Sequence, residues 1–389
     1  MNKYNTYLGQ LTSLIGRSEF DSLVKRMEAD KYCKGFDAWS QTMVMIFAQI
    51  TEQNGLRGIT QSMNQNSNAF YHLGIHKEIK RATLSYANNN RDCKFFEALY
   101  YTMLNKLDRK QRGLYRKHFF AIDATTIGLN MHDFPWARFR STKSGVKIHV
   151  KYDLNNSVPD YLFVTNARKN ENTTLSDMKL NEGDTAVFDK GYNNYKTFSQ
   201  FYQDGILFIT RLKSNADFTI VERRECTQEG ITSDCIIRFK GTTAKKNCPY
   251  ELRRIRSVDS ETGKSIIVLT NIMDRSAKHI AEMYRKRWQI ELFFKAIKQN
   301  LKIKTFYGRS ENAVKTQIWI AMIVYLLYLL LQMAVKNTEK KFGYFIAELS
   351  VCLFHRSGYL LDWFSGILPH AFSPPGCLET KDFQMELGL

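Results

Sequence analysis

The sequence YRKRWQIELFFKAIKQNL, residues 284–301, has the spacing of an α-helix with one chemically crowded face. With Tyr284 at 0° and about 100° per residue, Arg287, Glu291 and Lys298 fall within about 60° of it. A narrow apolar stripe lies beside this row and contains Met283, Ile290, Phe294, Ile297 and Leu301. We therefore expect a helix that packs on the core with a charged row along the edge of the contact. An Arg287–Glu291 pair on a solvated face is the alternative, and it leaves Tyr284 and Lys298 unexplained.

Two apolar runs elsewhere, KHFFAIDAT at 117–125 and TAVFDKGY at 185–192, have the composition of buried strands that end in Asp123 and Asp189. Taken singly, an aspartate in such a place is more often a turn or cap residue. Together with Glu291 the two would form three converging carboxylates, which repel one another unless divalent cations neutralise them. All-oxygen ligation favours Mg²⁺ or Mn²⁺ over zinc. Two such ions can activate a water molecule in phosphodiester chemistry.

The composition points to a polyanionic partner. The chain has 389 residues, with 56 Lys and Arg against 38 Asp and Glu, which gives a net charge of +18. A share of 44% apolar residues excludes intrinsic disorder. Residues 275–315 hold eleven basic and three acidic residues, and residues 136–151 hold five basic and none acidic. Such stretches suit a phosphate backbone, and Trp136 or Trp288 could stack on an unpaired base.

Residues 1–112 read as helical. Residues 36–51 have helical spacing with Asp37 as a possible cap, and further helices are expected at 56–63 and 83–107. The last carries polar residues that suit the recognition helix of a helix-turn-helix domain, namely Arg81, Ser85, Asn88, Asn89 and Arg91. The alternative is an ordinary helical bundle with a solvated polar face.

The middle of the chain predicts a mixed α/β sheet. Three strands at 117–125, 144–154 and 159–167 precede an alternation of helix and strand that ends at 206–212. Residues 213–272 hold four further strand patterns without helical periodicity, which indicates a small antiparallel insertion. A long helix is expected from Asp274 onward.

One apolar run could cross a membrane. Ile318–Leu331 is unbroken and apolar, but a span needs about 20 such residues, so we favour a buried core helix that covers the sheet. Seven cysteines at irregular spacing, without any CxxC motif, make a disulfide framework or a zinc site improbable and favour a reducing interior. The first residues show no export signal, and we expect a cytoplasmic protein.

These motifs resemble the DDE transposases of bacterial insertion sequences. The order Asp123, Asp189 and Glu291 follows the family pattern, and the helix matches Y-x2-R-x3-E-x6-K, the signature of the insertion-sequence-four group. The segment DKGY at 189–192 agrees with that group's second aspartate motif. The resemblance covers about 113–335, and the helical segment before it resembles a module found in one branch of the group.

The resemblance implies an RNase H-like catalytic core at 113–335, interrupted by the β insertion at 213–272. A helical DNA-binding domain at 1–112 would precede it, and a C-terminal region at 336–389 would follow. Asp123, Asp189 and Glu291 would bind two Mg²⁺ ions, for which Mn²⁺ could substitute.

DNA contacts are expected from a larger set of residues: Tyr284, Arg287, Trp288, Lys295, Lys298, Arg81, Asn88 and Arg91. The implied reaction is cleavage of double-stranded DNA at the ends of the insertion sequence, followed by transfer of the 3′-OH to target DNA. A homodimer on DNA and association with the nucleoid are expected. A non-cutting DNA-binding protein descended from a transposase is the alternative, although such a binder need not keep three acidic residues.

Overall fold

The computed structural model describes residues 6–111, 118–168, 173–258, 263–335, 340–355 and 360–365. The chain divides into two compact units. One unit combines Met1–Gln111 with Lys295–Leu389 and is helical, and the other comprises Arg112–Phe294 and contains the sheet. The segment after the signature helix therefore packs with the N-terminal helices.

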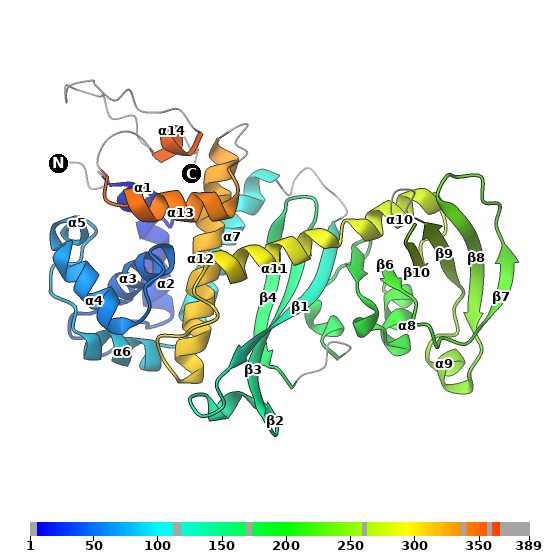
Figure 1. Ribbon diagram of the computed structural model, residues 1–389, viewed down its shortest axis with the longest axis horizontal. Coiled ribbons are helices and arrows are strands. Elements are labelled where there is room, and N and C mark those ends of the chain that lie inside the picture. The colour runs from blue at the N-terminus through cyan, green and yellow to red at the C-terminus, as the bar shows by residue number, and fades with distance from the viewer. Residues whose placement is uncertain are drawn as a thin grey trace. The chain divides into compact units, whose positions relative to one another are not determined.

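The helical unit is built from short helices around one long apolar helix (Figure 1). The helices before the sheet are α1 (Tyr7–Ser13), α2 (Arg17–Arg26), α3 (Ala38–Ile50), α4 (Leu56–Gln65), α5 (Ser67–Tyr71), α6 (Arg81–Asn90) and α7 (Lys94–Gln111). Those after it are α12 (Glu311–Ala334), α13 (Phe342–Cys352) and α14 (Leu360–Ser365). Asp37 caps α3 as predicted, because its side chain accepts a hydrogen bond from the Ser40 amide at 2.7 Å.

The single helix expected at 83–107 is two helices, α6 and α7, and this expectation was wrong. The chain breaks at Arg91, whose backbone is extended. Its guanidinium turns inward and binds Asp30 at 3.0 Å and the Phe36 carbonyl at 3.0 Å. These contacts of the buried Arg91 side chain stabilise the break, which no helical periodicity reveals.

Helix α12 is the core of the helical unit. Every residue from Ile318 to Leu331 is buried, as the core-helix interpretation requires. Its neighbours are α3, α6, α7, α13 and α14. The expectation that it covers the sheet was therefore wrong, because helices cover it instead. Within the described residues it is the one helix long and apolar enough to cross a bilayer.

The sheet unit contains ten strands in one sheet. They are β1 (Phe119–Leu129), β2 (Arg138–Arg140), β3 (Lys143–Asp153), β4 (Val158–Asn166), β5 (Thr185–Phe188), β6 (Leu207–Arg211), β7 (Phe218–Arg223), β8 (Ile231–Phe239), β9 (Leu252–Val258) and β10 (Ser265–Thr270). The order β4-β3-β1-β5-β6 has antiparallel pairs on one side of β1 and parallel pairs on the other. This is the mixed sheet that the sequence predicted, and it fits the RNase H-like core that the resemblance implied.

The insertion extends the core sheet and does not form a separate one. Strand β10 pairs antiparallel with β6, and β9, β8 and β7 follow in order. A short helix, α9 (Thr242–Asn247), lies within the insertion and was not predicted. The buried pair of Arg253 and Asp234, joined by two bonds of 2.6 and 2.9 Å, links β9 to β8. Arg253 also donates to the Arg275 carbonyl at 2.6 Å and so holds the segment that leads into the next helix.

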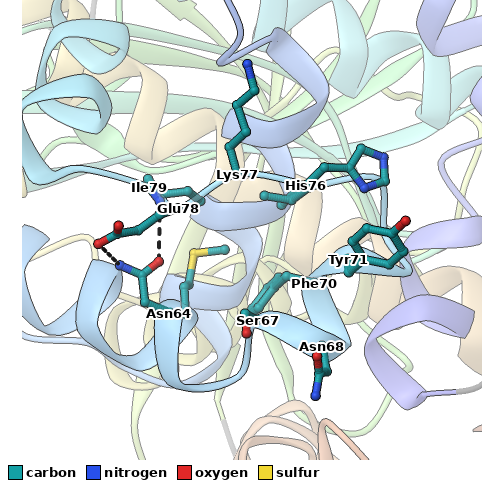
Figure 2. Close-up of a pocket in the computed structure, with 11 residues that line it drawn as sticks. Asn64, Ser67, Asn68, Phe70, Tyr71, His76, Lys77, Glu78 and Ile79 are labelled. Carbon is teal, nitrogen blue, oxygen red and sulfur yellow. Dashed lines mark hydrogen bonds between the residues drawn. The ribbon is translucent and has the colours of Figure 1, made fainter.

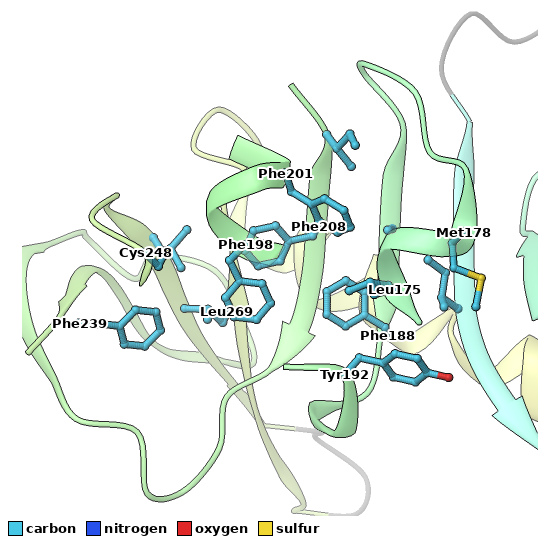
Figure 3. Close-up of a cluster of buried hydrophobic side chains, with 14 of the residues drawn as sticks. Leu175, Met178, Phe188, Tyr192, Phe198, Phe201, Phe208, Phe239, Cys248 and Leu269 are labelled. Carbon is cyan, nitrogen blue, oxygen red and sulfur yellow. The ribbon is translucent and has the colours of Figure 1, made fainter. Parts of the chain in front are cut away.

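The two faces of the sheet pack against different elements. Phe188 and Phe208 lie on one face, against α8 (Tyr195–Gln203) and the 3-10 turns at 175–178 and 190–192 (Figure 3). Ile122 belongs to the same buried cluster. Val187 and Ile209 lie on the other face, against α10 (Ala277–Arg285). Because side chains alternate along a strand, residues that follow Ile122 and Phe188 point toward the α10 face.

Candidate active site

Asp123 lies on β1, and Asp189 directly follows β5, the parallel neighbour of β1. The pairing of β1 with β5 ends at Ile122 and Phe188, and the two aspartates come next in register. Adjacent strands lie about 4.8 Å apart, so the two backbones are close at this point. The expectation that Asp123 ends its strand was wrong, because β1 continues to Leu129 along β3. Asp123 instead marks the end of the pairing with β5.

The signature segment contains a break that the helical wheel did not anticipate. Helix α10 ends at Arg285 and α11 spans Trp288–Asn300, so the long helix expected from Asp274 is two helices. The Arg287 amide bonds to the carbonyl of Tyr284, three residues back, at 3.1 Å. Such tighter turns change the angle per residue. Tyr284 thus lies in the last turn of α10, Arg287 lies in the turn between the helices, and Glu291 lies on α11.

Arg287 joins two of the predicted catalytic acids. Its guanidinium lies 3.4 Å from an Asp123 carboxylate oxygen and is hydrogen-bonded to Glu291. Its side chain is 15% exposed, so these contacts are shielded from bulk water. Among the described residues, no three His, Cys, Asp or Glu side chains are close enough to hold a metal ion. In this structure an arginine lies between two of the three carboxylates.

Tyr284 is buried next to the same charges. Helix α10 packs on the sheet through a cluster that includes Tyr284 and Val187 of β5. Burial raises the pKa of Tyr284 to about 12, with Arg287 opposing the rise and Asp189 adding to it. The phenol is therefore a neutral donor at neutral pH. Among the described residues, neither its oxygen nor the Arg287 Nε has a hydrogen-bond partner of ordinary geometry, and both atoms are buried.

Two further residues complete this edge of the sheet, and sequence reasoning missed both. The pairing of β5 with β6 places Phe188 opposite Thr210, so Arg211 is next in register to Asp189. Asn193 fixes the turn after Asp189, because it accepts from Thr210 and donates to the Arg211 carbonyl, both at 2.8 Å. Arg211 could have been found as another charged residue at the end of an apolar run.

The remaining residues of the signature row follow on α11. Trp288 is 58% exposed and presents an aromatic face to solvent, whereas Trp136 is partly buried. Lys298 is half-buried, and burial lowers its pKa, with Lys304 lowering it further. Lys295 is exposed. The apolar stripe behind the row is buried as predicted and comprises Met283, Ile290, Phe294, Ile297 and Leu301.

The basic stretch at 136–151 contributes fewer cations than its sequence suggests. Lys151 is buried in an ion pair with Asp160 at 2.7 Å and donates to the Lys179 carbonyl at 2.9 Å. It therefore has a structural role. Arg138, Arg140 and Lys143 are exposed.

Two of the three DNA contacts expected on the N-terminal helices are structural residues. Asn88 is 2% exposed and accepts a hydrogen bond from Gln41 at 2.7 Å. Arg91 also binds Gln41, and its side chain is 8% exposed. Because these groups bind one another inside the bundle, neither presents its polar atoms to DNA, and this expectation is corrected. Arg81 is exposed at the start of α6.

Comparison with known proteins shows which protein family the chain belongs to. Residues 115–327 match the family described as the transposase DDE domain, and residues 3–76 match a domain of unknown function, DUF4372. The chain therefore belongs to the DDE transposase domain family. Its relatives place it among the DDE transposases of bacterial insertion sequences. Membership of the insertion-sequence-four group stays a prediction.

The similar proteins differ in their sequence identity to this chain and in the share of it that they cover. A protein from Sinorhizobium fredii named as transposase y4zB is 36% identical over 249 residues, which cover 63% of this chain and 69% of that protein. A protein from Geobacillus stearothermophilus, named as a transposase for insertion sequence element IS5377, is 29% identical, covering 69% and 71%. The piggyBac transposase synaptic complex with hairpin DNA matches with a TM-score of 0.44 and 12% identity over 97% of this chain and 88% of that one. This last likeness is too weak to define the fold.

Proposed function

We propose that this protein cuts DNA at the ends of its insertion sequence and joins the freed 3′-OH to target DNA. Two observations support the proposal: Asp123 and Asp189 directly follow the last paired residues of β1 and β5. In addition, Arg287 links Asp123 to Glu291. The family match over 115–327 supports the same reaction. A helical DNA-binding region at 1–112 and a homodimer on DNA, associated with the nucleoid, belong to the proposal.

The carboxylates suit divalent cations. Asp123, Asp189 and Glu291 supply only oxygen donors, the ligands that Mg²⁺ and Mn²⁺ prefer. We propose that these three residues hold two such ions. When bound, the ions would supply an activated water or hydroxyl and neutralise charge at the phosphate. Arg287 meanwhile keeps Asp123 and Glu291 from repelling each other in the free protein.

The basic row suits the phosphates of the bound DNA end. Tyr284 and Arg287 each have a buried polar atom that bonds to none of the described residues, and a phosphate oxygen would accept from both when DNA binds. Lys298 lies about two turns beyond Glu291 on the same helix, so it follows the same face. Exposed Trp288 would stack on an unpaired base, and exposed Lys295 would add a backbone contact.

The alternative is a DNA-binding protein that no longer cuts. The inward-facing carboxylates argue against it, because Asp123 is only 20% exposed and is stabilised by Arg287. A binder without chemistry gains nothing from acids placed where they repel phosphate.

Salt dependence of DNA binding tests the basic row. Arg287→Ala and Lys298→Ala should each weaken binding to end DNA and lower the slope of log K against log salt by about 0.9 on duplex DNA. Fluorescence anisotropy at several salt concentrations measures both quantities. Lys196→Ala is the matched control, because Lys196 is exposed on α8, which covers the opposite face of the sheet. Slopes equal to that of the control would show that the row does not contact phosphate.

A further inference from the structure

A basic hollow of about 650 Å³ lies in the helical unit. The start of α4 contributes Gly55, Leu56 and Arg57, and the start of α6 contributes Arg81, Ala82 and Ser85. Tyr307, from the segment between α11 and α12, forms the remaining wall. Three separate stretches of the chain thus meet at one surface depression.

The two charged residues that line the hollow are both positive. Arg57 and Arg81 are exposed, and within the described ranges neither takes part in an ion pair. Lys302 reaches the rim, since its ammonium donates to Asn54, the residue before Gly55, at 3.3 Å. Glu52 is the acidic residue nearby, and burial together with its charge raises the pKa of Tyr307.

Buried side-chain amides hold residues 302–307, which border the hollow, in place. Gln49 of α3 and Gln317 of α12 are 0% and 1% exposed. Gln49 accepts from the Lys302 amide at 2.8 Å, and Gln317 accepts from the Tyr307 amide at 2.9 Å. The Tyr307 hydroxyl donates to the Gln53 carbonyl at 2.9 Å. Burying amide groups is costly unless they are bonded, and here their bonds fix the wall of the hollow.

Hydrogen bonds also link α4 to the segment that leads into α6, the two helices whose first turns line the hollow. Asn64 of α4 accepts from the Ile79 amide at 3.3 Å and donates to Glu78 at 3.2 Å, just before α6 begins (Figure 2). Neither α4 nor α6 has a side-chain hydrogen bond at its N-cap. Their first amide groups therefore add partial positive charge to that of the two arginines.

We propose that this hollow seats the phosphate backbone of duplex DNA, with Arg57 and Arg81 as its two main contacts. Arginine forks match phosphate oxygens, and helix N-termini favour anions. Such contacts position DNA without reading its sequence. The proposal rests on the proposed function, and it gives Arg81 a backbone role in place of the base-reading role expected from the sequence.

A double variant tests the hollow. Arg57→Gln/Arg81→Gln should lower the slope of log K against log salt by about 1.8, from two lost contacts at about 0.9 each. The change should be equal for end DNA and for an unrelated duplex, measured by fluorescence anisotropy on the full chain. Lys25→Gln/Arg26→Gln is the matched control, because both residues are exposed on α2, outside the hollow. Glu52→Gln should act in the opposite direction and tighten binding.

The outcomes separate this inference from the proposed function. An unchanged slope in the double variant would overturn the inference, even if cleavage still requires Asp123 and Glu291. A change seen with end DNA alone would also overturn it, because the contact would then read bases. If the slope falls on both duplexes while variants of Asp123 and Glu291 cleave normally, the hollow binds DNA as proposed. The proposed cleavage chemistry is then wrong. Thermal unfolding at the wild-type temperature confirms that each variant is folded.

Discussion

Asp189→Asn, Asp123→Asn and Glu291→Gln are each expected to reduce strand cleavage in Mg²⁺ by about 10³-fold or more. A divalent ion supplies several kcal/mol of transition-state stabilisation, and about 4 kcal/mol corresponds to roughly 10³ in rate. Each substitution removes a carboxylate from the site while keeping the shape of the side chain. Single-turnover cleavage of a labelled DNA end measures the effect.

The same three variants should bind end DNA at least as tightly as the wild type, because they remove negative charge near phosphate. This separates loss of chemistry from loss of binding. Asp204→Asn is the matched control, since Asp204 is exposed at the end of α8, which packs on the opposite face of the sheet. A variant that cleaves at the control's rate would remove its residue from the proposed site.

Leu327→Lys is expected to abolish cooperative unfolding of the helical unit. Leu327 is 0% exposed in the middle of α12. The change loses about 2–5 kcal/mol of packing and adds an ammonium that burial strongly disfavours. Together these costs approach the whole stability of a domain, about 5–15 kcal/mol. Calorimetry or circular dichroism on heating, without detergent, measures the loss.

Val351→Lys is the control for this substitution. Val351 is 83% exposed on α13 of the same unit, so a lysine there should change stability by no more than about 0.5 kcal/mol. If α12 instead faces lipid, the wild-type chain will stay insoluble until detergent is added. Similar unfolding of the two variants would likewise contradict a buried α12.

Local sequence patterns predicted the elements of the fold well. Period-two alternation found β3, and apolar runs found β1, β5 and β6, because strand positions with one buried face must alternate. The cap at Asp37 was equally readable, since a short acceptor before an apolar helix has few other uses. The antiparallel pairing of β10 with β6 was not predictable in this way, because pairing between distant strands leaves no local pattern.

The sequence predicted which residues form the candidate site, but it did not predict how the structure arranges them. The acids were found from their positions after apolar runs, whereas the turn at Arg287 was missed because a helical wheel assumes unbroken geometry. The ion pairs that Arg287 makes depend on two segments far apart in the sequence, β1 and the stretch from the turn after α10 into α11. Likewise, polarity alone marked Asn88 as a DNA contact, although its true partner is Gln41, 47 residues away.

The most direct measurement uses DNA that carries both ends of the insertion sequence, together with an unrelated target plasmid. Purified protein is incubated with both in Mg²⁺, and the break points and joined products are sequenced. We expect breaks with a 3′-OH at the boundaries of the insertion sequence, then joining of those ends to the target, with neither product when Mg²⁺ is chelated. Specific binding of the ends without any Mg²⁺-dependent break would contradict the proposed function and favour the non-cutting DNA-binding protein.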